Sequence, residues 1–150
     1  DLIARGLAHN HRVLCAAPAS LARRGPPRTP AELSAHDCLA IKERDQAFGV
    51  WRLRAGAAEQ SVKVTGPLSA NNGEMVVQWA VDGRGIALRS LWDVGAHLQA
   101  GRLVQLLPEW RQEANVWAVY PTRLQLSAKV RVCVEFLQEH FQQEWAAAAS

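Results

Sequence analysis

The sequence predicts an α/β protein, because segments with the pattern of buried strands alternate along the chain with segments of helical spacing. Two further observations support a globular protein. The chain has 150 residues, of which 49% are hydrophobic and 21% are charged, and this composition excludes a disordered tail or a small disulfide scaffold. No internal repeat or low-complexity linker interrupts it, so composition indicates no domain boundary.

Strand and helix signals follow one another from the start of the chain. The apolar run 12–17 predicts a buried strand, and a short helix over 19–24 follows it. Gly25 ends that helix, because glycine is typical just after a helix end. Thr29 and Glu32 match a capping box, in which each satisfies an amide of the other, so a second helix is expected to begin there.

The middle of the chain predicts a strand, a loop and a hairpin. Residues 36–41 are expected to form a strand, followed by a polar loop over 42–46. The segments 50–54 and 60–64 both alternate apolar and polar residues, and the small residues 56–58 supply a turn between them. This pattern favours a hairpin with one face in water.

Helices and strands continue to alternate in the second half. Gly83 and Gly85 interrupt the helical pattern and are expected to form the turn at a helix end. The predicted helices cover 74–82 and 91–99, and the predicted strands cover 86–88, 103–106 and 116–120.

A long final helix is predicted after Ser127, which can cap it. One stripe of this helix is apolar and normally requires a sheet to cover it. We therefore expect self-association through the stripe, or another chain segment that covers it. The stripe consists of Val130, Cys133, Val134, Leu137 and Phe141.

The charge pattern does not favour a nucleic-acid groove or a membrane partner. The net charge is +3, and Arg and Lys are scattered instead of gathering on one face. In the segment 51–54, alternation places Trp51 in a core and its two arginines in water, so we prefer this interpretation to base stacking. No stretch approaches the ~20 apolar residues of a membrane span, and the start does not resemble a signal peptide.

The three cysteines indicate a reducing compartment, because they are odd in number and lack CxxC spacing. Cys15, Cys38 and Cys133 each have apolar neighbours, so we expect all three to be buried as small hydrophobic residues.

Other combinations of reactive residues carry little chemistry. The segment 83–85 follows a helix instead of a strand, which argues against a dinucleotide cofactor. His9 and His11 lack a third metal ligand nearby, and His36 and Cys38 do not form a nucleophile with its base by adjacency alone. We therefore predict no enzyme, no cofactor and no metal site.

The strongest candidate site is the helix start at residues 69–73. Free backbone amides and the positive end of the helix dipole make such a start suitable for an anion. Gly73 allows a ligand to approach the backbone, and Asn71 and Asn72 can exchange hydrogen bonds with it. Simple capping by Asn71 or Asn72, without a ligand, is the alternative.

The order and spacing of four segments over residues 2–145 resemble the effector-binding region of LysR-type transcriptional regulators. One departure is Ser20, where family members usually have an aromatic Tyr. The four segments are RVLCAAPASLARRGPPRTPAELSAHDCLAI, GPLSANNGEMVVQWAVDGRGIALRSLWDV, LQAGRLVQLLPEW and VWAVYPTRLQLSAKVRVCVEFL.

This resemblance implies a periplasmic-binding-protein-like (type II) fold with a small molecule held between two lobes. Residues 18–115 would form a complete second lobe, and residues 1–17 and 116–145 would form part of the first. Two crossing strands, 12–17 and 116–120, would join the lobes, and the helix 128–143 would pack on the first lobe. The DNA-reading helix-turn-helix and the early elements of the first lobe are expected to be absent, which indicates a fragment.

The resemblance also implies a site and partners. The expected partners are a small anionic or polar effector, a second copy of the protein in a cytoplasmic dimer or tetramer, and DNA only through the absent domain. A stand-alone solute-binding protein and a nucleic-acid-binding domain remain alternatives. The implied effector-binding residues are Ser69, Ala70, Asn71, Asn72, Gly73, Leu88 and Tyr120.

Overall fold

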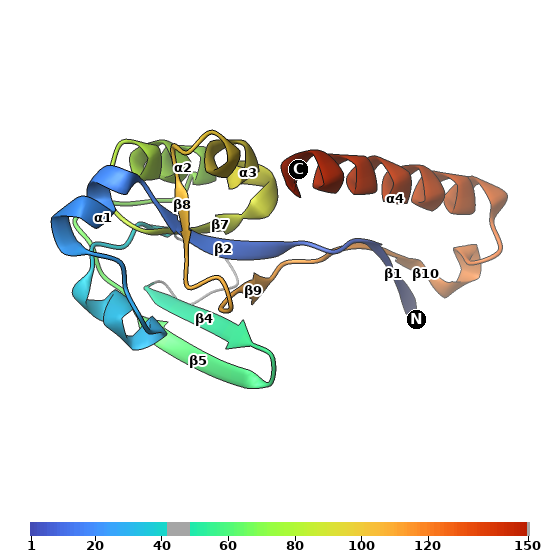
Figure 1. Ribbon diagram of the computed structural model, residues 1–150. Helices are drawn as coiled ribbons and strands as arrows, with labels where there is room; N and C mark the ends of the chain where they lie inside the picture. The colour runs from blue at the N-terminus through green and yellow to red at the C-terminus, as the bar shows by residue number, and fades with distance from the viewer. Residues whose placement is uncertain (42–48, 150) are drawn as a thin grey trace.

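The strand β2 (His11–Ala16) lies at the centre of the larger part of the molecule in the computed structural model, which describes residues 1–41 and 49–149 (Figure 1). Residues 13–16 are all buried, because layers of the protein cover both faces of this strand. A continuous apolar run is the pattern of such a strand, and the prediction over 12–17 is confirmed. The antiparallel partners of β2 are β7 (Ala87–Ser90), β8 (Val104–Leu106) and β9 (Gln112–Glu113).

Two helices cover one face of this sheet, as Figure 1 shows. They are α2 (Gly73–Val81) and α3 (Leu91–Gln99), close to their predicted ranges. Alternation along β2 sends every second side chain into this layer. The resulting core cluster includes Val13 and Cys15 from β2, Ala87 from β7, Val76 and Ala80 from α2, and Val94 from α3.

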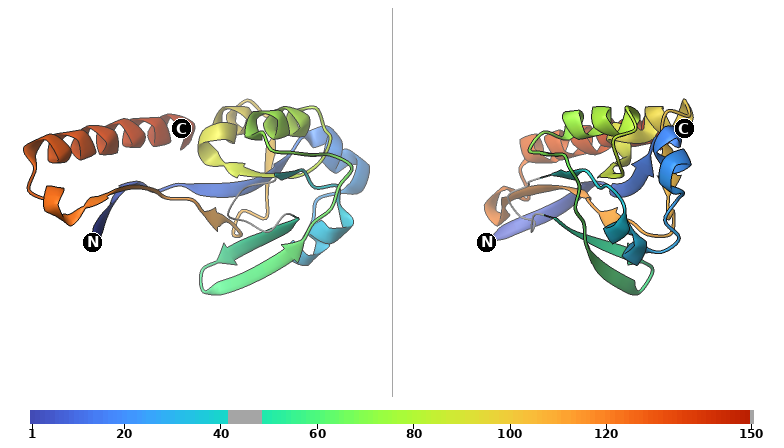
Figure 2. Two further views of the ribbon diagram at one scale, coloured as in Figure 1. Left: turned by 180° about the vertical axis from the view of Figure 1, so that it is seen from behind. Right: turned by 90° about the vertical axis from the view of Figure 1, so that its left-hand side faces the viewer.

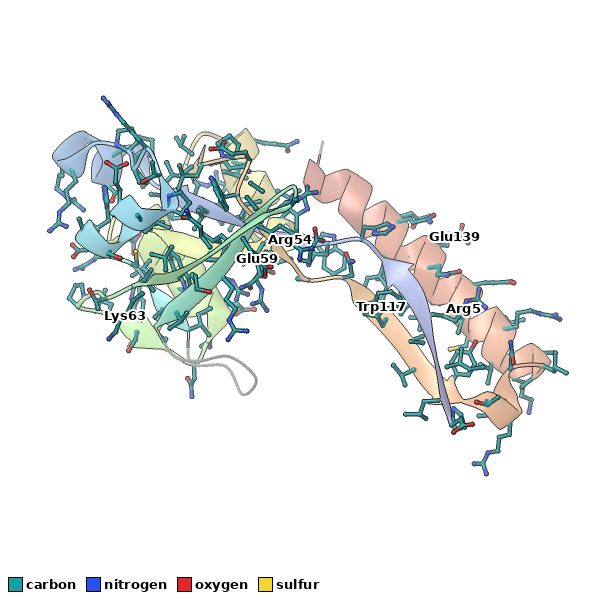
Figure 3. The ribbon with its side chains drawn as sticks, turned by 90° about the horizontal axis from the view of Figure 1, so that it is seen from below. Arg5, Arg54, Glu59, Lys63, Trp117 and Glu139 are labelled. Atoms are coloured by element: carbon teal, nitrogen blue, oxygen red, sulfur yellow. The ribbon has the colours of Figure 1, made fainter. Side chains whose placement is uncertain are left out.

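The predicted hairpin covers the opposite face. It consists of β4 (Val50–Ala55) and β5 (Ala58–Lys63), and Ala55 pairs with Ala58 across a two-residue turn. Trp51 is buried in the core beneath it, whereas Arg52 and Arg54 are exposed, so the core interpretation of this segment is confirmed. Figure 3 shows Arg54 and Glu59 near one end of the hairpin and Lys63 at the other.

Short elements complete this part of the molecule. The capping box is present, with the Thr29 amide donating to Glu32 Oε2 at 2.8 Å, but it begins a 3-10 helix. The predicted loop 42–46 lies outside the described residues. The remaining elements are α1 (Pro18–Arg24), η1 (Pro30–Ala35), and the parallel pair β3 (Ala40–Ile41) and β6 (Ser69–Ala70).

An elongated arm extends from this body (Figures 1 and 2). β1 (Leu2–Ala8) and β10 (Val116–Pro121) pair antiparallel and form a two-stranded ribbon. The short helix η2 (Thr122–Leu124) leads from the ribbon to α4 (Ala128–Ala149), which returns along it. The Ser127 hydroxyl accepts a hydrogen bond from the Val130 amide at 3.4 Å, which confirms the predicted cap.

Within the described residues, the arm contacts the body through α3 and at the chain connections beside Asn10. Trp92 of α3 stacks on Phe141 of α4, with ring centroids 5.4 Å apart. At the connection between β1 and β2, the Asn10 amide donates to Asn115 Oδ1 at 2.9 Å, and the Ala114 amide donates to the Asn10 carbonyl at 3.0 Å. The chain thus passes between the two parts near residues 9–10 and 114–115. We expected β2 to be the outgoing crossing strand, but it pairs within the central sheet.

One face of α4 stays in solvent, and its composition differs from the predicted stripe. Val134 is buried, and Val130, Leu137 and Phe141 are half-buried, because α4 packs on β1 and α3. The prediction that Cys133 is buried is wrong, since its side of the helix faces away from β1 and α3. Beside it Val132 is 62% exposed and Phe136 is 67% exposed. In the described ranges, no helix is long and apolar enough to span a bilayer.

The buried thiols should be inert towards alkylation. Burial raises the pKa of Cys15 to about 12, and burial together with the negative charge of Asp37 raises the pKa of Cys38 to about 12. Because the thiolate is the reactive form, an iodoacetamide pulse near neutral pH should label Cys133 only. Mass spectrometry measures this, and all three thiols should react in denaturant. Rapid labelling of a Cys133→Ser variant would contradict the buried placement of the other two.

The exposed face of α4 should drive association of the 150-residue chain. Burying a Val or Phe side chain stabilises a complex by roughly 1.5–3 kcal/mol. Sedimentation velocity should therefore show species larger than a monomer, and the double variant Val132→Ser, Phe136→Ser should shift them towards the monomer. Glu139→Gln, an exposed polar change on the same helix, is the matched control. A monodisperse wild-type monomer with this face in solvent would contradict the expectation.

Candidate functional site

The helix start at residues 69–73 is polar and largely exposed. β6 carries the chain to Asn72, and α2 begins at Gly73. Asn72 Oδ1 accepts hydrogen bonds from the Glu74 amide at 2.9 Å and from the Met75 amide at 3.4 Å. These two amides are therefore not available to an anion in this structure, because the Asn72 side chain caps the helix itself. Ser69, Asn71 and Asn72 are exposed to solvent beside it.

Arg89, which is not among the predicted site residues, lies against this helix start. Its guanidinium occupies the space next to Gly73, where a Cβ atom would lie 2.6 Å from Arg89 Cζ. Only glycine leaves room for that approach. Arg89 Nη2 forms an ion pair with Asp93 Oδ2 at 2.6 Å, and its side chain is 16% exposed. The described residues thus bring a mostly buried positive charge to the predicted site.

Helix dipoles make this position unfavourable for a cation by itself. Arg89 approaches the first residue of α2 and pairs with the first turn of α3, and the N-terminal ends of both helices carry partial positive charge. The acidic residues in these first turns, Glu74 in α2 and Asp93 in α3, offset that charge. An anion near Arg89 would be stabilised by the guanidinium and by both helix ends.

Leu88 and Tyr120 are not brought to this helix start. Leu88 is buried in the core beneath the hairpin, because alternation along β7 directs it away from the side that Arg89 faces. Tyr120 lies on the ribbon opposite Ile3, near the end of β10 that is farther from the body. The side chain that reaches Gly73 is thus Arg89, the residue next to the predicted Leu88. Alternation along β7 is the sequence signal that indicates it.

A buried polar group connects this region to the arm. Asn10 is 5% exposed, and its Nδ2 donates to the Ser90 hydroxyl at 2.6 Å. Within the described residues, Asn10 Oδ1 is buried without a hydrogen-bond partner. Ser90 directly follows Arg89 and precedes α3. The junction between the two parts thus lies one residue along β7 from the arginine.

The other residues that the sequence singled out lie in surroundings that explain them by packing and charge. Burial, assisted by the positive charge of Arg111, lowers the pKa of His11, and Glu113 opposes this effect. The Cys38 thiol donates to the Leu33 carbonyl at 3.4 Å. Gly83 has φ 82° at the end of α2, which confirms the predicted helix-terminal turn. Among residues 1–41 and 49–149, no three His, Cys, Asp or Glu side chains form a group that could hold a metal.

A cavity of about 310 Å³ lies in the arm. Side chains of β1, β10 and α4 line it together with His9 and Asn115, and Gln138 Nε2 donates to the Gly6 carbonyl at 2.7 Å. Trp117, labelled in Figure 3, forms part of its wall on the ribbon. None of its lining residues belongs to the helix start at 69–73.

Comparison with known proteins relates this fold to regulators of transcription. The LysR substrate binding domain matches residues 1–142. The chain is 57% identical over 145 residues to the HTH-type transcriptional regulator DmlR of Escherichia coli K12. The aligned region covers 97% of this chain and 47% of DmlR. It is 55% identical over 141 residues to the HTH-type transcriptional activator TtdR of the same strain, covering 94% and 46% of the two chains.

The solved structures show the same fold as this chain. The regulatory domain of CrgA, a LysR-type transcriptional regulator from Neisseria meningitidis, superimposes with a TM-score of 0.72 at 28% identity, over 92% of this chain and 68% of that domain. The chain spans about half the length of the curated relatives it matches. Because the domain match extends over nearly all of the sequence and the fold agrees, the chain belongs to the LysR family of transcriptional regulators and represents its substrate-binding domain.

Proposed function

We propose that this chain is the effector-sensing part of a transcriptional regulator and that it binds a small anionic or polar metabolite between two lobes. The second lobe comprises residues 18–115 together with the strand β2, which pairs within its sheet, and the strand β1 and residues 116–145 belong to the first lobe. The observation that carries the proposal is the exposed polar helix start at 69–73 with the Arg89 guanidinium packed against Gly73. The exposed side-chain amides of Asn71 and Asn72, the Ser69 hydroxyl and the positive charge of Arg89 are groups of the kind that bind small anions.

The contacts described above between body and arm provide a route from binding to regulation. A ligand changes a conformational equilibrium only by binding one arrangement more tightly than another. Asn10 and the Trp92–Phe141 stack both lie where the arm meets the body, so a ligand that repositions α3 or β7 alters these contacts. In the whole regulator, a cytoplasmic dimer or tetramer, that change would alter the spacing of the DNA-reading parts.

The remaining parts of the proposal follow from the relatives. DmlR and TtdR are named HTH-type regulators, and the chain matches about half of each, so we assign DNA reading to the other half of the protein. No catalytic step and no cofactor enter this function. The partners are the effector, further copies of the regulator, and DNA through that other half.

A charge change at Asn72 tests the position of the site. Asp and Asn are equivalent helix caps, so Asn72→Asp should keep α2 intact while it adds a negative charge at the helix start. Like-charge repulsion should then weaken binding of an anionic effector by roughly fivefold or more. The measurement is calorimetric titration of the full-length regulator with the metabolite that changes its operator binding.

The matched control is Asn72→Ser, which also caps the helix and adds no charge. It should retain most of the affinity and the same thermal unfolding temperature. Equal affinities for Asn72→Asp and the wild type would remove this helix start from the effector site.

A further inference from the structure

We propose that the Arg89 guanidinium binds a carboxylate group of the effector. When no effector is bound, the Asp93 carboxylate forms an ion pair with the same guanidinium. This inference rests on the proposed function and specifies the chemical class of ligand at its site. Asp93 acts as an internal competitor, and the effector replaces one carboxylate by another without changing the charge next to the arginine.

The arginine is held in place by its surroundings. It extends from the end of β7 between the first residue of α2 and the first turn of α3, and 84% of its side-chain surface is covered, given the 16% that remains exposed. A guanidinium is planar and presents parallel N–H groups that match a carboxylate. Because it is already ordered and mostly desolvated, little side-chain freedom is lost when a ligand binds.

Asp93 is more exposed to solvent than Arg89. Its side chain is 43% exposed, so its carboxylate can leave the 2.6 Å ion pair for water. Ion pairs with one partner this exposed contribute little to stability, so replacing the Asp93 carboxylate by another carboxylate costs little free energy. The helix ends beside the guanidinium add positive potential, so a negatively charged group is favoured over a neutral one where the Asp93 carboxylate leaves.

Another buried polar group, Asn10, lies next to this strand end. Asn10 Oδ1 is buried and has no hydrogen-bond partner among the described residues, and its Nδ2 binds Ser90, the neighbour of Arg89. Asp93 itself follows Trp92, which stacks on Phe141 of the arm. Exchange at Arg89 thus acts on the first turn of α3, which touches the arm.

The test is calorimetric titration of the full-length regulator with simple carboxylates, namely acetate, succinate, citrate and benzoate. Acetamide, succinamide and benzamide are the uncharged controls. At least one carboxylate should bind and its amide should not. Asp93→Asn removes the competitor and should tighten binding by about two- to fivefold. Arg89→Gln should weaken it more than tenfold, and Arg89→Lys should fall between, because lysine keeps the charge without the fork.

Thermal unfolding of each variant controls for folding, and Arg89→Lys keeps the charge if Arg89→Gln is unstable. The proposal is overturned if no carboxylate binds either the wild type or Asp93→Asn. It is also overturned if Asp93→Asn fails to tighten binding, or if the amides bind as well as the acids.

A reporter assay separates this inference from the proposed function. A metabolite response that survives Arg89→Gln but is lost in Asn72→Asp overturns the role of Arg89 and keeps the helix start as the site. A response that survives both variants overturns the proposed site as well.

Discussion

The burial of β2 on both faces is the constraint on which the rest of the structure depends. Its side chains alternate between a helical layer formed by α2 and α3 and a layer formed by the β4–β5 hairpin. Both layers are anchored to this one strand, and the arm joins the body just before it begins, at Asn10. The strand therefore determines where the helix start at Gly73, the end of β7 and the junction with the arm lie relative to one another.

The same alternation that fills the two layers builds the candidate site. Along β7, Leu88 enters the core beneath the hairpin, so the next residue, Arg89, faces α2 and α3. A charged side chain at that position needs space and a counterion, which Gly73 and Asp93 provide. The core and the site are thus consequences of one strand geometry, and a change in the register of β7 would disturb both.

Local patterns predicted most of the elements, because their causes lie within a few residues. The hairpin follows from alternation and a small-residue turn, the final helix from its Ser127 cap, and the end of α2 from Gly83. The strand β1 had no comparable signal, since its Ala and Gly residues are weak strand formers and its partner β10 lies at the other end of the chain. Cys133 has apolar neighbours, yet the direction in which α4 packs leaves it in solvent.

The sequence by itself determined the α/β class, the order of the elements, the polar helix start at 69–73 and the resemblance to LysR-type regulators. These properties depend on periodicity, capping and composition, which act over short distances along the chain. Only the tertiary structure decided that Arg89 packs on Gly73, that Leu88 is buried, and that Asn72 caps its own helix. Such contacts depend on which distant segments share a surface, and that choice is made by the packing of the whole core.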